Sequence, residues 1–146
     1  MKLIEGKYYQ FKVLKTVNLP DEGDFYMLRH QSGRRLLLPV EPYKNYCIDE
    51  DDTIECKVDK INCTGKVFLE PKHPVYLEGK IYDFIVKSTS INDDELSQTI
   101  SVHDVFFNEI NIDWPKNTQK PKVAESIKLC VEQVKKGIPI LSIPVR

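Results

Sequence analysis

Residues 5–16 read EGKYYQFKVLKT, and residues 78–89 read EGKIYDFIVKST, a near repeat displaced by 73 positions. Seven of the twelve aligned positions are identical, whereas two unrelated segments of this length share about one. The displacement is half of the 146-residue chain. The sequence therefore predicts two similar domains, residues 1–72 and residues 73–146, which meet near EPKHPVYLEGK at residues 70–80.

The repeated segment has the pattern of a β-strand with one buried face. Three residues spaced by two recur unchanged: Tyr9, Phe11 and Val13 in the first copy, and Tyr82, Phe84 and Val86 in the second. Side chains two residues apart share one face of a strand, so these residues are expected to point into a core. The intervening Tyr8, Gln10 and Lys12 are expected to face solvent.

Turn residues and apolar alternation divide each domain into five short strands. In the first domain the expected strands are residues 7–16, 25–30, 34–40, 53–61 and 66–70. In the second they are residues 82–89, 96–103, 105–112, 126–134 and 138–143. Expected loops lie at residues 18–24 and 90–95, and a polar connector at residues 116–124. Pro71 is expected to end the fifth strand, and residues 41–46 to include one helical turn.

Five strands with at most a short helix between the third and fourth predict an all-β fold, two small five-stranded Greek-key (OB-fold) barrels in tandem. Residues 53–61 (TIECKVDKI) followed by residues 65–69 (GKVFL) resemble the last two strands of S1-type OB-fold domains. The resemblance covers residues 5–71 and, more faintly, 78–144. It implies RNA binding, although the histidine that the S1 family carries on its third strand is absent here.

The charge of the chain argues against a strong nonspecific grip on phosphate. The net charge is −1, with 12 Lys and Arg against 12 Asp and Glu in residues 1–73, and 9 against 10 in residues 74–146. Any nucleic-acid site must therefore be a local patch.

OB barrels that bind single strands use the face of strands two and three with the flanking loops. Aromatic rings there stack on bases, and guanidinium groups hold phosphates. The candidate binding residues of the first domain are Phe25, Tyr26, Arg29, His30, Arg34, Arg35, Lys57, Lys60 and Lys66. The alternative is that Phe25 or Tyr26 belongs to the core and that the arginines form a solvated hairpin end.

The second domain offers fewer groups that suit a nucleic acid. Its corresponding region carries the acidic run at residues 92–95 with Asp104, Phe106, Phe107 and Glu109, and carboxylates repel phosphate. The sequence therefore predicts that the first domain binds single-stranded nucleic acid, with RNA favoured over DNA, while the second braces it or contacts a protein. The alternative function is a protein-interaction or adaptor module.

The chain carries no motif typical of an enzyme, a metal site or a cofactor site. His30 and His103 are expected to occupy equivalent positions in the two domains, but no thiol or carboxylate recurs with them, so neither metal binding nor catalysis is predicted. Cys47, Cys56, Cys63 and Cys130 show no disulfide or zinc spacing and are interpreted as reduced thiols, with Cys56 in a core. Without a long apolar run or a signal peptide, a cytoplasmic location is expected.

Overall fold

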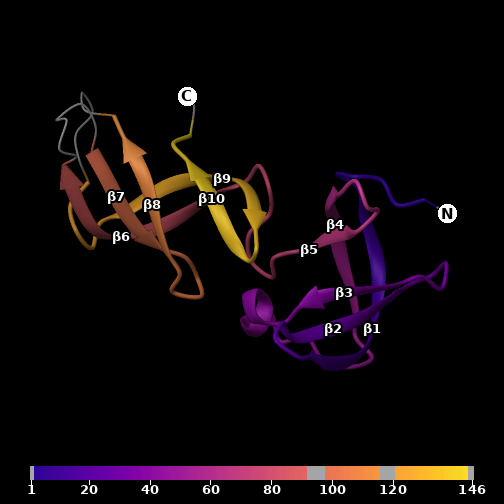
Figure 1. The fold of residues 1–146 in the computed structure, drawn as a ribbon. Coiled ribbons are helices and arrows are strands. Elements are labelled where there is room, and N and C mark those ends of the chain that lie inside the picture. Colours follow the sequence, from indigo (N-terminus) through magenta and orange to yellow (C-terminus); the bar gives the residue numbers. More distant parts are fainter. Residues whose placement is uncertain (1, 92–97, 116–120, 145–146) are drawn as a thin grey trace. The chain divides into compact units, whose positions relative to one another are not determined.

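The computed structural model describes residues 2–91, 98–115 and 121–144. The chain divides into two compact units, Met1–Pro74 and Val75–Arg146, so the boundary lies two residues beyond the one expected from the repeat. The fold is all-β, with one five-stranded antiparallel sheet in each unit (Figure 1). This confirms the predicted fold class of two small barrel-like domains in tandem.

The strands of the first unit follow the predicted order along the chain. They are β1 (Tyr8–Leu19), β2 (Gly23–His30), β3 (Arg35–Pro39), β4 (Thr53–Ile61) and β5 (Val67–Pro71). Neighbouring strands pair in the order β3-β2-β1-β4-β5. The outer strands β3 and β5 also approach each other. The sheet is therefore curled into a nearly closed barrel, which is how small β-domains limit exposed strand edges.

The central strand β1 is long enough to serve two neighbours. Its first half pairs with β4, and its second half pairs with β2, so that Lys12 lies opposite both Thr53 and Arg29. A bulge at Leu14 interrupts the pairing with β2 between Val13 and Lys15. Bulges bend a strand and increase its twist, which allows β1 to follow the curvature of the barrel.

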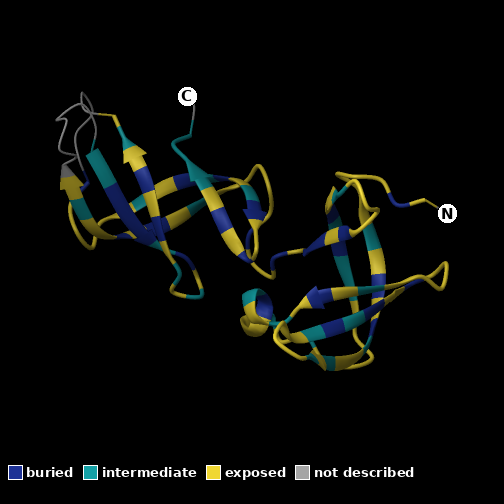
Figure 2. Ribbon diagram, viewed as in Figure 1, coloured by how far each residue is buried: buried dark blue, intermediate teal, exposed yellow. Residues whose placement is uncertain are grey.

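The core of the first unit consists of side chains that alternate along the strands (Figure 2). Phe11 and Val13 are buried and Tyr9 packs against the cluster, as the repeat predicts. Cys56 is fully buried in the same cluster, as expected. The remaining buried members are Leu3, Tyr26, Leu28, Leu38, Tyr43, Val58, Val67 and Leu69.

The second unit has the same connectivity. Its described residues form β6 (Ile81–Ile91), β7 (Gln98–His103), β8 (Glu109–Trp114), β9 (Ser126–Lys135) and β10 (Ile138–Ser142), paired in the order β10-β9-β6-β7-β8. A bulge at Lys87 in β6 takes the place of the bulge at Leu14. The core of this unit is built from Tyr76, Phe84, Val86, Ile100, Val102, Ile110, Ile112, Leu129, Val131 and Val134.

Several predicted element boundaries are wrong. The first loop is only the turn Pro20–Glu22, because β1 continues to Leu19 and β2 begins at Gly23. The strand expected from residue 105 begins at Glu109. Pro71 was expected to follow the fifth strand, but it is the last residue of β5 and pairs with Cys56. A proline is tolerated there because β5 is an outer strand of the sheet.

In the second unit, Ser90 and Ile91 belong to β6 rather than to the predicted loop. Three predicted segments lie outside the described residues: the rest of that loop, the expected start of the next strand at residues 96 and 97, and residues 116–120 of the connector.

The predicted helical turn is a 3-10 helix, η1 (Glu41–Tyr46), between β3 and β4. Its buried Tyr43 donates a hydrogen bond of 2.9 Å from its hydroxyl to Oε1 of Glu70, itself buried at the end of β5. Burial and the neighbouring Glu70 carboxylate together raise the pKa of Tyr43 far above its usual range. This pair fastens η1 to β5.

Replacing Tyr43 with Phe should lower the free energy of unfolding at pH 7 by about 1–2 kcal/mol, because it removes the hydroxyl that satisfies a buried acceptor. Urea denaturation of the two proteins measures this difference. Above about pH 10 an unfolded tyrosine loses its proton while folded Tyr43 keeps it, so stability falls as the pH rises. The fall should be shallower in Tyr43→Phe, and an equal fall in both proteins would contradict this role.

Candidate functional site

The exposed face of β2 and β3 gathers residues of the kind expected to bind a single strand. Along β2 the side chains of Tyr26, Leu28 and His30 point inward, and those of Phe25, Met27 and Arg29 alternate with them on the outer face. In Figure 2 this alternation is visible along the strand as buried bands separated by intermediate or exposed ones. Residues directly opposite each other on neighbouring strands share a face, so the strand register defines the surface.

The register orders this outer face into three rows that cross β1, β2 and β3. The first row is Lys12, Arg29 and Arg35; the second is Lys15, Met27 and Leu37; the third is Val17, Phe25 and Pro39. Positive charge is therefore concentrated in the first row, whereas the apolar residues lie in the second and third. We call these nine residues the β2–β3 face.

The two arginines of the cationic row are available to a ligand. Within the part of the chain that the structure describes, neither Arg29 nor Arg35 forms an ion pair, and both are exposed. The Nζ of Lys12 lies 4.0 Å from Oδ1 of Asp51, and both side chains are exposed to solvent. An exposed pair of this kind contributes little stability, so it does not prevent Lys12 from meeting an anion.

The apolar rows leave large side chains accessible. Leu37 is 40% exposed, Pro39 is exposed, and Phe25 and Met27 are half-buried. Six residues of the β2–β3 face were not predicted from the sequence as binding residues: Lys12, Lys15, Val17, Met27, Leu37 and Pro39. The signal was present in the period-two alternation of both strands, once Phe25 rather than Tyr26 is placed on the outer face.

Tyr26 and His30, both predicted to contact a ligand, are buried on the inner face. The His30 ring packs against Tyr9 and Phe11, with both centroid distances 5.6 Å. Its Nδ1 accepts a hydrogen bond from the backbone N–H of Ser32 at 3.2 Å and lies 2.9 Å from the Ser32 hydroxyl. His30 thus organises the β2–β3 turn, and Tyr26 belongs to the core, where burial raises its pKa.

The other predicted cations lie away from these rows. Arg34 is exposed in the turn between β2 and β3. Lys57 is on β4, opposite Tyr8 and Glu70, and Lys60 pairs with Phe68 of β5. The Nζ of Lys66 lies 5.1 Å from the centroid of the Phe68 ring, a distance typical of a cation–π contact. Of the nine predicted residues, the structure therefore brings together Phe25, Arg29 and Arg35.

The equivalent face of the second unit is chemically different. Its three rows are Ile85, His103 and Glu109; Ser88, Ser101 and Asn111; and Ser90, Thr99 and Asp113. The repeat displacement is 73 residues in β6 but 74 in β7 and β8, so the chain of the second unit has one additional residue between these positions. His103 therefore corresponds to Arg29, and the prediction that it corresponds to His30 is wrong. The counterpart of His30 is Asp104, which is also buried and also organises a turn.

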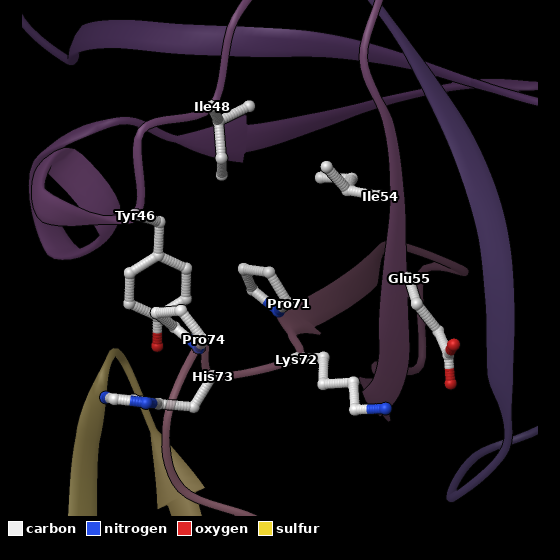
Figure 3. Close-up of a pocket in the computed structure, with 8 residues that line it drawn as sticks. All are labelled: Tyr46, Ile48, Ile54, Glu55, Pro71, Lys72, His73 and Pro74. Carbon is white, nitrogen blue, oxygen red and sulfur yellow. The ribbon is translucent and has the colours of Figure 1, made fainter.

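A separate pocket of about 320 Å³ lies elsewhere on the first unit (Figure 3). It is lined by Tyr46, Ile48, Ile54, Glu55, Pro71, Lys72, His73 and Pro74. Its volume is at the lower end of the range of small-molecule sites. The aliphatic and proline side chains suit an apolar group, and Figure 3 shows Glu55 and Lys72 at one edge. No motif marks this pocket in the sequence, since its walls come from three separate segments.

Comparisons of the chain with models of known protein families, with curated proteins and with solved structures give no significant match. No helix among the described residues is long and apolar enough to cross a membrane. The described part of the chain also contains no group of three His, Cys, Asp or Glu side chains placed to hold a metal ion. The geometry and charge of the β2–β3 face therefore make it the candidate functional site.

Single substitutions should separate the exposed face from the core beneath it. Arg29→Ala should change the free energy of unfolding by no more than about 0.5 kcal/mol, because the side chain is exposed and unpaired. The adjacent His30→Ala should lower it by about 2–4 kcal/mol, since it leaves a cavity and removes the acceptor for Ser32. Urea denaturation measures both effects, and equal losses in the two variants would contradict this assignment of faces.

Proposed function

We propose that the first unit binds single-stranded nucleic acid without catalysis, through the β2–β3 face. The observation that carries the proposal is the division of this face into a cationic row and adjacent apolar rows. A single strand presents phosphates along one edge and unpaired bases along the other, so it needs both surfaces side by side.

The rows assign a role to each group. The guanidinium groups of Arg29 and Arg35 donate to phosphate oxygens, and Lys12 adds a third positive charge. Guanidinium donors match phosphate geometry well and are attracted to it at short range. Bases pack against Met27 and Leu37 and stack on the accessible part of Phe25. Every base has a flat apolar face, so contacts of this kind discriminate little between sequences.

The preference for RNA over DNA rests on the resemblance of residues 53–69 to S1-type domains. The cytoplasmic location expected from the sequence is likewise a prediction. With a net charge of −1, the chain supplies no broad positive field, so we expect modest affinity that depends on the local patch.

Binding of a fluorescein-labelled, unstructured RNA oligonucleotide should weaken steeply with salt. Each phosphate contact to a single strand contributes about 0.7 to the slope of log K against log salt. The double variant Arg29→Ala/Arg35→Ala should therefore reduce that slope by about 1.4 and weaken binding at low salt. Fluorescence anisotropy across a salt series measures both quantities.

The matched control is Lys57→Ala/Lys60→Ala, which removes the same charge from β4. This control should bind more tightly than the arginine double variant. Equal losses in the two double variants would show that only overall charge matters. An absence of RNA binding by the unaltered chain at low salt would overturn the proposed function, and tighter binding of the matching DNA would overturn the preference for RNA.

Two exposed or half-exposed phenylalanines of the first unit provide a second test. Phe25 lies on the β2–β3 face, whereas Phe68 lies on β5 and is 41% exposed. Phe25→Ala should weaken RNA binding by about 1–3 kcal/mol, the usual cost of losing a ring that stacks on a base, while Phe68→Ala should leave it unchanged. Anisotropy titrations at fixed salt, with thermal unfolding of each variant, distinguish lost stacking from lost folding. A larger loss for Phe68→Ala would place the site at β5 and not on the β2–β3 face.

A further inference from the structure

The turn between β7 and β8 of the second unit holds an aromatic residue in a backbone conformation that such residues avoid. Phe107 has φ 64°, in the left-handed region. Its counterpart in the first unit is Gly33, with φ 91°. The two turns share the same backbone hydrogen bonds, since Gly33 N–H donates to the His30 carbonyl and Phe107 N–H to the Asp104 carbonyl. Glycine adopts this conformation without strain, but a bulky side chain adopts it only at a cost in free energy.

The Phe107 side chain does not serve the core of its unit. It is 82% exposed, more than the other large apolar residues described. Its ring lies beside that of His103, with ring centroids 6.1 Å apart and planes inclined by 68°. A strained residue whose ring is left in water gains nothing from burial within the fold, and strain of this kind is concentrated at functional sites.

The turn is held rigidly around Phe107. Oδ1 of the buried Asp104 accepts hydrogen bonds from the backbone N–H groups of Phe106 at 2.9 Å and Asn108 at 2.8 Å. Its Oδ2 accepts a third from the Asn108 side-chain amide at 2.8 Å. The turn is held by a fourth hydrogen bond, which the N–H of Val105 donates to the hydroxyl of Tyr76 at 2.9 Å. An anchor fixed in this way loses little conformational entropy on binding.

Apolar side chains surround Phe107, whereas the first unit has cationic side chains at the corresponding positions of its outer face. Ile85 is 50% exposed and pairs with His103, and Val105 in the turn is 45% exposed. The positions of Ile85 and His103 correspond to Lys12 and Arg29 of the first unit. The cations that would hold a phosphate are thus replaced by an apolar patch, which favours a protein over a nucleic acid.

The charges beside the patch indicate the chemistry of the partner. Glu109 follows on β8 and accepts a hydrogen bond of 3.3 Å from Nζ of Lys87, which lowers the Glu109 pKa. Asp113 lies further along the same face of β8 and is exposed. The charge of Glu109 is offset by Lys87, whereas Asp113, two rows further along β8, forms no ion pair among the described residues. The complementary surface is therefore expected to carry positive charge where it meets Asp113.

We propose that Phe107 is the anchor of a protein-docking site, formed with Ile85, His103 and Val105, and that it inserts into an apolar pocket with a basic rim on a different protein. Anchors of protein interfaces are commonly single aromatic side chains that fill a pocket, surrounded by residues that exclude water. This site is independent of the nucleic-acid function proposed for the first unit.

The test begins with the full chain carrying a photoreactive phenylalanine analogue at position 107, or at position 68 as the control. Irradiation in cells that naturally make the chain should crosslink one protein at position 107 and not at position 68. That protein, once purified, becomes the probe. Isothermal titration should show that it binds the unaltered chain, and that Phe107→Gly weakens binding about 30-fold or more, as loss of an interface anchor does.

The Phe107→Gly variant separates docking from folding. Glycine relieves the left-handed strain, so its thermal midpoint should be equal to or higher than that of the unaltered chain. A second variant, Asp113→Asn, should weaken binding less and reduce its dependence on salt. The proposal is overturned if position 107 crosslinks no protein, nucleic acid only or a second copy of this chain, or if the purified partner binds Phe107→Gly as tightly as the unaltered chain.

Discussion

The register of the central strand is the constraint on which the rest of each barrel depends. In the first unit β1 pairs with β4 and β2 at once, and the bulge at Leu14 shifts the pairing with β2 by one residue. Because side chains alternate with a period of two, the register in which Phe11 and Val13 lie opposite His30 and Leu28 decides which residues of β2 point inward. It places Tyr26, Leu28 and His30 in the core and leaves Phe25, Met27 and Arg29 on the surface.

The two units keep this interior constraint and vary the exterior. The bulge recurs at Lys87, and buried Tyr26 and Leu28 of β2 have the apolar counterparts Ile100 and Val102 in β7. The residues of the outer face are not constrained by packing in this way. The row of Lys12, Arg29 and Arg35 in the first unit corresponds to Ile85, His103 and Glu109 in the second. A duplicated barrel can therefore preserve its packing while its two exposed faces come to suit different classes of ligand.

The sequence predicted the fold well because the repeat and the period-two pattern both report on the core. It could not predict the site as fully. Phe25 and Tyr26 are adjacent aromatics, and the register of β2 against β1 decides which one faces outward. The equivalence of His30 and His103 failed because one additional residue before β7 changes the displacement from 73 to 74, which moves His103 to the outer face. Local patterns do not record such an insertion.

Backbone strain adds information that composition lacks. Phe107 is an ordinary aromatic in the sequence, and only its φ of 64° and its exposure show that the fold does not require it. Gly33 satisfies the same turn without a side chain. A residue that strains the backbone and also exposes an apolar ring is disfavoured on two independent grounds. Its presence on a turn braced by buried Asp104 is accounted for by an interaction outside the unit, since no contact among the described residues of the unit offsets either cost.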